Sequence, residues 1–225
     1  MGKNEKVKKG KLSPENFLEQ FSHKSYKFLK SRITTSQLSD ALRNVTGQNG
    51  VLSGVKPIKS SFTIMGKAIT VKTSGNDWGT VIKGIYESGK GDILVISCDK
   101  DDPAVWGELA SSTAQKQGLT GTVIYGGSRD IAGIKKLDYP VFSRKVIPNA
   151  GKPLAEGLIN IPIICGQTTV HPGDFIMGDE CGVVCVPNEI TEEVLEESYK
   201  ILNNEDHIIR QLDDGKSFLD ILRIK

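Results

Sequence analysis

Residues 107–140 constrain the fold more than any other segment, because one continuous run combines a helix, a strand and a tight turn. Alanines and polar residues at helical spacing open the run. Gly118 and Gly121 are expected to end this helix, since glycine readily adopts the left-handed conformation found there. Residues 122–125 are β-branched or aromatic, which is typical of a buried strand. With a second helix expected over residues 131–137, the run indicates an α/β architecture.

An Arg129-Asp130 dipeptide stands between that strand and the second helix, just after the pair Gly126-Gly127. In open α/β architectures, ligands bind at the carboxyl ends of strands. There, Arg129 can hold a carboxylate through its planar fork, and Asp130 can hold a hard divalent cation through oxygen. The two residues can equally be a surface ion pair with Asp130 at the helix N-cap, because such pairs are common and weak. The dipeptide alone does not separate these interpretations.

The rest of the chain mixes helices and strands in an order that favours a layered domain. Residues 92–98 are a continuous apolar strand of the kind buried on both faces. Residues 61–72 are expected to be a strand with a turn at residues 65–67, and helices are expected over residues 34–44 and 192–212. Strands first alternate with helices and then run together, which fits a layered β/β/α domain better than a doubly wound sheet.

Length and composition limit the classes of protein that fit. The chain has 225 residues, of which 38% are hydrophobic and 25% charged, as in ordinary globular proteins. No apolar run approaches the roughly 18 residues of a membrane span, and a net charge of +2 gives no reason to expect nucleic acid binding. Residues 1–12 are expected to be a basic arm, without the apolar segment of a signal peptide, and residues 13–225 a single domain. We therefore expect a cytoplasmic protein.

Two groups of side chains could hold a metal, and each has a simpler explanation. Three carboxylates, Asp99, Asp101 and Asp102, follow the apolar strand and could form a metal site, although a solvated loop is favoured. The cysteines lie in or beside apolar runs, so we expect them to pack in the core as small hydrophobes, without a zinc site or a disulfide. They are Cys98, Cys165, Cys181 and Cys185.

The spacing around the dipeptide resembles a motif of the RraA-like family, which includes the 4-hydroxy-4-methyl-2-oxoglutarate aldolases and the regulator of ribonuclease E. Glu108 is followed by twenty residues and then by Arg129-Asp130, and the aldolases carry an acidic residue at this spacing. A second block, residues 170–184, is also similar to the family, and the resemblance covers roughly residues 35–215. Most of the aldolases have Asp where this chain has Glu108, so the side chain here reaches one methylene further.

The resemblance implies a swivelling β/β/α domain with N- and C-terminal helices, which assembles as trimers or hexamers. It also implies a metal-dependent aldolase that cleaves a carbon–carbon bond of a small 2-oxo acid and releases pyruvate, with decarboxylation of oxaloacetate as a side activity. Such cleavage leaves an enolate, whose charge must be stabilised. No lysine stands in a clear Schiff-base context, so Mg²⁺ or Mn²⁺ is the expected cofactor.

The resemblance also implies roles for individual residues. Asp130 would hold the metal, Arg129 would donate hydrogen bonds to the oxo or enolate oxygen, and Glu108 would take the proton of the 4-hydroxyl group. The family also uses an acid from the C-terminal helix of a neighbouring subunit, for which Glu205 and Asp206 are both candidates. Backbone N–H groups at a helix N-terminus would bind the substrate carboxylate; the substrate-binding residues are Gly107, Glu108, Leu109, Ala110 and Arg129.

One alternative function stays open. The ribonuclease E regulator shares the fold and binds a protein partner without turning over a substrate, so this chain can also be a non-catalytic regulator that binds a ribonuclease or another protein. Family members of that kind lack the acidic residue before the helix, and Glu108 therefore favours an enzyme. A methyltransferase activity, also associated with the family, is set aside because no glycine-rich methyl-donor motif follows a first strand.

Overall fold

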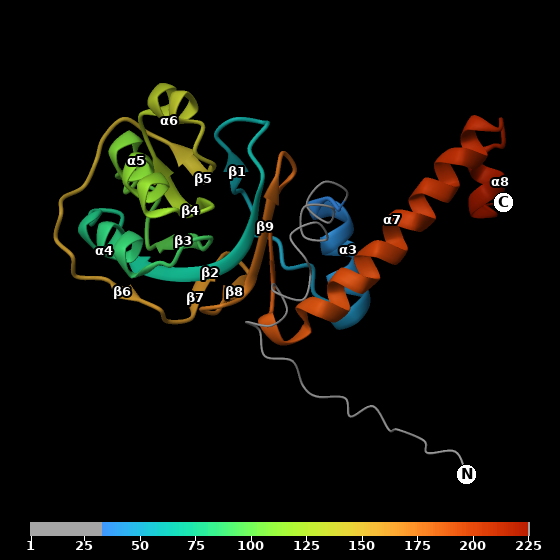
Figure 1. The fold of residues 1–225 in the computed structure, drawn as a ribbon, viewed down its shortest axis with the longest axis horizontal. Helices are drawn as coiled ribbons and strands as arrows, with labels where there is room; N and C mark the ends of the chain where they lie inside the picture. The colour runs from blue at the N-terminus through green and yellow to red at the C-terminus, as the bar shows by residue number, and fades with distance from the viewer. Residues whose placement is uncertain (1–32, 225) are drawn as a thin grey trace, which may run out of the picture. The chain divides into compact units, whose positions relative to one another are not determined.

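The computed structural model describes residues 33–224 and contains an eight-stranded sheet (Figure 1). In spatial order the strands are β1 (Lys56–Pro57), β5 (Val141–Val146), β4 (Gly121–Ser128), β3 (Ile93–Cys98), β2 (Ile64–Thr73), β9 (Phe175–Asp179) and β10 (Gly182–Val186), and β6 (Leu158–Ile159) pairs with β2. The four strands from β2 to β5 are parallel, and the others pair antiparallel with their neighbours. A separate hairpin consists of β7 (Ile163–Cys165) and β8 (Thr168–Val170).

Three helices connect the parallel strands: α4 (Gly79–Glu87), α5 (Glu108–Gln117) and α6 (Ile131–Leu137). Figure 1 shows them near one another along β2 to β5 and away from the two longer helices, α3 (Thr35–Thr46) and α7 (Thr191–Asp213), which pack against each other. A 3-10 turn, η1 (Asn188–Ile190), precedes α7, and α8 (Phe218–Leu222) follows it. The structure confirms the α/β class and the helices predicted over residues 34–44, 131–137 and 192–212.

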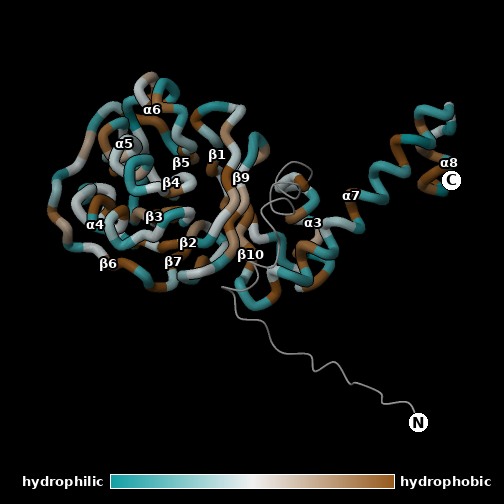
Figure 2. The backbone as a smooth tube through the Cα atoms, viewed as in Figure 1, coloured by the Kyte–Doolittle hydropathy of each residue, from teal (hydrophilic) through white to brown (hydrophobic). Residues whose placement is uncertain are grey.

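The parallel strands form the core because their side chains are apolar and covered on both faces. Every residue of β3 is buried, and β4 is buried except for the half-buried Tyr125. In Figure 2 a hydrophobic stretch also runs along β9, whereas the peripheral loops are largely hydrophilic. The buried strand predicted over residues 92–98 is therefore confirmed, with its first strand residue at Ile93.

One predicted turn is wrong. β2 continues without interruption through residues 65–67, where a turn was expected at Gly66. A Cβ atom at Gly66 would lie 2.8 Å from the carbonyl oxygen of Gly91. This glycine therefore allows β2 to pass close to the backbone of the turn before β3. Glycine in a strand can serve such a close approach, and the sequence pattern does not distinguish that role from a turn.

Three of the four cysteines are buried, as predicted, but Cys181 is exposed at the turn between β9 and β10. The prediction is wrong for Cys181, because the tip of this hairpin points to solvent instead of continuing the apolar strand. All four are free thiols. Burial raises the pKa of Cys98 and of Cys165 to about 12, so both stay protonated and unreactive at neutral pH.

Two further expectations concern the N-terminal residues and membrane-spanning helices. The basic arm over residues 1–12 and the start of the domain at residue 13 lie outside the described residues. Within residues 33–224, no helix combines the length and the apolar character that crossing a membrane requires.

Candidate active site

The Arg129-Asp130 dipeptide lies directly after β4, beside the segment that opens α5. Trp106 forms an isolated parallel bridge with Ser128, and the backbone N–H of Arg129 donates to the carbonyl oxygen of Trp106 at 2.9 Å. These contacts hold the start of α5 against the end of β4. They bring Glu108 close to the dipeptide, although twenty residues separate them in the sequence.

Asp130 has an unusual backbone conformation for its position. It is the N-cap of α6, with φ of 58° and ψ of 42°, but its side chain makes no capping hydrogen bond. Its Oδ2 atom instead faces the start of α5, where it accepts from the backbone N–H of Glu108 at 3.4 Å and lies 3.5 Å from Nε of Arg129. Left-handed residues other than glycine cost about 1–3 kcal/mol and concentrate at functional sites. Capping therefore does not explain the direction of this carboxylate.

Gly107 is the residue that makes room for the dipeptide. A Cβ atom at this position would lie 2.5 Å from Oδ2 of Asp130 and 3.3 Å from Cγ of Arg129. Any larger residue would push both side chains away from the start of α5. The family resemblance implied that Gly107 is a substrate-binding residue, and the structure gives it a steric reason to be glycine.

Glu108 has its backbone at the site and its side chain to one side of it. The residue is exposed, and a Cβ atom at Gly133 in α6 would overlap its carboxylate. The carboxylate therefore rests on α6, and Glu108 is absent from the residues that line the pocket described next.

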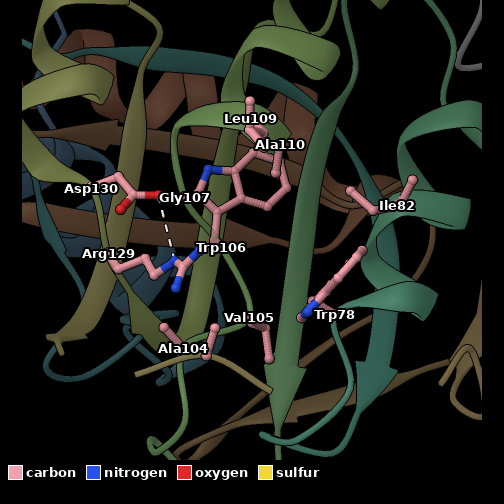
Figure 3. Close-up of a pocket in the computed structure, with 11 residues that line it drawn as sticks. Trp78, Ile82, Ala104, Val105, Trp106, Gly107, Leu109, Ala110, Arg129 and Asp130 are labelled. Atoms are coloured by element: carbon pink, nitrogen blue, oxygen red, sulfur yellow. Dashed lines mark ion pairs between the residues drawn. The ribbon is translucent and has the colours of Figure 1, made fainter. Parts of the chain in front are cut away.

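A pocket of about 150 Å³ opens beside the dipeptide. Figure 3 shows Arg129 and Asp130 at one side of it, Trp78 and Ile82 at the other, and Trp106 between them. Sequence reasoning missed Trp78 and Ile82, which come from α4 and the turn before it; a tryptophan in the turn after a buried strand was the available signal. The lining residues are Trp78, Ile82, Ala104, Val105, Trp106, Gly107, Leu109, Ala110, Arg129, Asp130 and Ala150.

The oxygen donors of the site suit a hard cation that keeps much of its water. Asp130 offers a half-exposed carboxylate whose two recorded contacts, at 3.4 and 3.5 Å, are long. No group of three or more His, Cys, Asp or Glu side chains that could hold a metal occurs among residues 33–224. Mg²⁺ commonly binds through one or two carboxylates, with water and substrate as its other ligands. Asp130 fits that pattern, and the backbone N–H of Glu108 lies beside its carboxylate.

The three carboxylates after β3 do not converge on one point. Asp99 accepts from the backbone N–H of Gly75 at 2.8 Å, and Asp101 lies 3.3 Å from Nη2 of Arg144. Asp102 accepts from the side-chain amide of Asn149 at 2.5 Å. Each carboxylate therefore contacts a different neighbouring segment: the turn after β2, β5 and the segment after β5.

The two candidate cross-subunit acids lie on α7. Glu205 accepts a hydrogen bond from the buried side-chain amide of Gln37, on α3, at 2.6 Å. Figure 1 shows α7 away from α5 and α6, and neither Glu205 nor Asp206 is among the residues that line the pocket. A role for either of them in this pocket requires a second copy of the protein.

The second block that resembles the family, residues 170–184, runs from the end of β8 through a turn at Asp174 and through β9 into β10. Asp174 is buried, and its carboxylate accepts from the backbone N–H of His171 at 2.7 Å and of Asn188 at 3.1 Å. These bonds fasten the start of β9 to the segment that follows β10. None of these residues lines the pocket beside Arg129-Asp130.

Comparison of the chain with models of known protein families identifies the family to which it belongs. The model of the RraA-like family, described as Aldolase/RraA, matches residues 35–185, which include the dipeptide, the start of α5 and the turn at Asp174. The chain belongs to the RraA-like family. The resemblance noted in the sequence is therefore confirmed.

Individual relatives of this RraA-like protein carry different names. An uncharacterised protein of Methanocaldococcus jannaschii is 42% identical over 177 residues, or 77% of this chain and 85% of that protein. A protein of Halalkalibacterium halodurans named "Putative 4-hydroxy-4-methyl-2-oxoglutarate aldolase" is 36% identical over 169 residues, or 75% of this chain and 79% of that protein. A crystal structure of an uncharacterised protein from Pseudomonas syringae pv. tomato has a TM-score of 0.74 and 27% identity, and covers 93% of this chain and 98% of that one.

Proposed function

We propose that this RraA-like protein is a divalent-metal-dependent lyase that cleaves 4-hydroxy-2-oxo acids, of the 4-hydroxy-4-methyl-2-oxoglutarate type, to pyruvate. Decarboxylation of oxaloacetate is the proposed side activity. The observation that carries the proposal is the meeting of Arg129, Asp130 and the start of α5 at one pocket. The name of the relative from Halalkalibacterium halodurans supports the same reaction class.

Arg129 and the start of α5 form the proposed anion site. The side chain of Arg129 is 42% exposed and its Nε atom lies 3.5 Å from Asp130, so it can turn its planar fork to a substrate oxyanion. The N-cap of α5 is Gly107, which has no side chain to cap the helix. The backbone N–H groups of Leu109 and Ala110 belong to the first turn and have no partner within the helix. A carboxylate at this helix N-terminus would accept from them.

Asp130 is the residue that would hold Mg²⁺ or Mn²⁺. When bound, the ion supplies a Lewis acid for the 2-oxo and carboxylate oxygens of the substrate. The left-handed backbone of Asp130 keeps its carboxylate directed toward α5 instead of along α6. It also keeps that carboxylate beside Arg129, so the groups that bind oxygen atoms of the substrate act from one side of the pocket.

Glu108 is the proposed base. In the cleavage, the C3–C4 bond breaks and its electron pair moves to C3, which gives the enolate of pyruvate and a carbonyl product. Glu108 takes the proton of the 4-hydroxyl group, directly or through one water, and C3 then takes a proton to give pyruvate. Arg129 stabilises the developing oxyanion. Decarboxylation of oxaloacetate forms the same enolate and needs no base for a hydroxyl group.

A trimer or hexamer is part of the proposal. In such an assembly Glu205 or Asp206 of a neighbouring copy would stand at the pocket, whose lining residues within one chain include neither of them. The end of α7 and the segment after it carry exposed apolar side chains that another copy would cover, and Figure 2 shows the hydrophobic stretch at α8. These side chains are Ile209, Leu212, Phe218, Leu219, Leu222 and Ile224.

The test is pyruvate release from 4-hydroxy-4-methyl-2-oxoglutarate and from oxaloacetate, each with Mg²⁺ and with EDTA. Metal-dependent turnover of the hydroxy acid supports the lyase. If only oxaloacetate is turned over, the proposed roles of Arg129 and Asp130 are supported and the proposed base role of Glu108 is contradicted. A folded oligomer that releases pyruvate from neither compound contradicts the lyase.

The alternative function is a non-catalytic regulator that binds a ribonuclease or another protein. The exposed apolar side chains of α8 are the observation that favours it, because a protein partner would bury them. The family description also joins aldolases with RraA. The two functions separate experimentally, because Arg129→Ala should abolish pyruvate release and leave the binding of a ribonuclease through α8 intact.

A further inference from the structure

The wall of the pocket opposite the dipeptide consists of carbon. The indole N–H of Trp78 donates to the carbonyl oxygen of Gly151 at 3.0 Å, and that of Trp106 donates to Oγ of Ser111 at 2.8 Å. Both indole N–H groups therefore already have partners within the protein, and the two rings present only apolar atoms to a ligand. Trp78 and Ile82 lie across the pocket from Arg129 and Asp130, and Trp106 lies between the two sides (Figure 3).

Arg129 is the one cationic side chain among the residues that line this pocket. A second hollow adjoins the same dipeptide, and its other walls are Val146, Ile147 and Pro148. Neither wall therefore offers a partner for a second negative charge. A carboxylate moved from water to such an apolar surface loses its hydration and gains no hydrogen bond in return, which is strongly unfavourable.

We propose that, among the 4-hydroxy-2-oxo acids that the site cleaves, it prefers those in which C4 carries an apolar alkyl or aryl group in place of the carboxylate that 4-hydroxy-4-methyl-2-oxoglutarate has there. This inference rests on the proposed lyase function and specifies its substrate class. The 2-oxo acid end would bind at Arg129 and the start of α5, and the apolar group would lie against Trp78 and Ile82. A dry apolar cavity of about 150 Å³ can hold a benzene ring, and this pocket has a volume of about 150 Å³.

The reaction stays balanced with such a substrate. The C3–C4 bond of R–CH(OH)–CH₂–CO–COO⁻ breaks, and its electron pair goes to C3. The hydroxyl proton leaves to a base, C3 gains a proton, and the products are the aldehyde R–CHO and pyruvate. No oxidant or second substrate is needed. Substrates of this kind differ only in R, which is the group that the pocket wall would contact.

The first experiment compares two substrates of similar size and opposite polarity. In 4-hydroxy-5-methyl-2-oxohexanoate R is isopropyl, and in 4-hydroxy-2-oxoglutarate R is a carboxylate. We expect kcat/KM to be higher for the isopropyl compound by roughly tenfold or more, as pocket contacts of this size discriminate by about 10–200-fold. A preference for the dicarboxylate overturns the inference and leaves the lyase function standing. Pyruvate release from neither compound contradicts the lyase function itself.

Variants that add a cation test the wall directly. Leu109 lines the pocket and is 83% exposed, so Leu109→Arg does not threaten folding. Ile82→Lys places the charge deeper in the wall. Each should move the ratio of the two kcat/KM values toward the dicarboxylate by roughly tenfold. Tyr86→Lys is the matched control, because Tyr86 is 63% exposed on the same helix as Ile82 but does not line the pocket. This variant should leave the ratio of the two kcat/KM values unchanged. Unchanged ratios in both pocket variants overturn the inference.

Binding can be measured without turnover. The chain has two tryptophans, Trp78 and Trp106, and both line the pocket. Titration with 4-methyl-2-oxopentanoate, which lacks the 4-hydroxyl group, should change their fluorescence at lower concentrations than titration with 2-oxoglutarate. Equal or tighter binding of 2-oxoglutarate would count against an apolar wall as the selecting surface.

Discussion

The carboxylate of Glu108 rests on Gly133 in α6, at a place where the Cβ atom of any other residue would overlap it. This contact explains how the site accommodates a glutamate at a position where the shorter aspartate is usual for the aldolases that the sequence resembles. The pair also links the proposed base to a residue that does not line the pocket.

Gly133→Ala should lower aldol cleavage without weakening the fold. Alanine in place of glycine within a helix ordinarily stabilises by about 0.5–1 kcal/mol, but here its Cβ atom displaces the Glu108 carboxylate. We expect kcat for the hydroxy acid to fall and oxaloacetate decarboxylation to stay unchanged, as measured by pyruvate release. Lys136→Ala, exposed on the same helix, is the control. In a Glu108→Ala background the Gly133 substitution should have no further effect, and an additive loss there would show that Gly133 acts in another way.

Glu108→Gln should separate the two proposed activities. The amide keeps the shape of the side chain and cannot take the proton of the 4-hydroxyl group, so kcat/KM for the hydroxy acid should fall by roughly 10²–10⁴-fold. Oxaloacetate decarboxylation, which needs no such base, should change little. Steady-state kinetics on both substrates measure the split, and equal losses would assign the base role elsewhere.

Arg129→Ala and Asp130→Ala should abolish both activities, because both reactions pass through the same enolate. Loss of one oxyanion donor typically lowers kcat by about 10²–10³-fold. Arg129→Lys keeps the charge and loses the planar fork, so it should recover only part of the rate. Near-normal decarboxylation by either alanine variant would remove the dipeptide from the mechanism. Circular dichroism should report an intact fold, because both side chains are 42% exposed.

The site was predictable from sequence only where residues lie on one helix–strand unit. The spacing from Glu108 to Arg129-Asp130 equals the length of α5 and β4 together with their connection, and these local elements have clear patterns. Trp78 and Ile82 reach the pocket from the start of α4, a different helix–strand unit. Hydrophobic periodicity does not predict how two such units pack against each other. Whether the dipeptide caps a helix or faces a pocket was likewise undecided, because the answer depends on the left-handed backbone of Asp130.

Asp77 connects the pocket wall to the pH dependence of stability. It is buried, and its carboxylate accepts from Oγ1 of Thr80 at 2.6 Å and from the backbone N–H groups of Gly79 and Ala155, each at 2.8 Å. Burial by itself would raise the pKa of Asp77, but the hydrogen bonds from Thr80, Ala155 and Glu156 outweigh it and hold that pKa well below its usual range. The network fixes the start of α4, next to Trp78.

A lowered pKa in the folded state means that ionised Asp77 stabilises the fold fully at pH values above its pKa in the unfolded chain, about 4. This stabilisation is lost progressively as the pH falls from there toward the lower pKa of the folded state. Asp77→Asn should therefore cost on the order of 2–4 kcal/mol at pH 7, with a smaller deficit at pH 3. Urea unfolding at both pH values measures it. Asp138→Asn is the matched control, because Asp138 pairs with Lys59 at the surface at 2.7 Å and such pairs contribute about 1 kcal/mol or less. A deficit of Asp77→Asn that stays the same from pH 7 to pH 3 would mean that the charge of Asp77 contributes nothing, and that its hydrogen bonds act through shape alone.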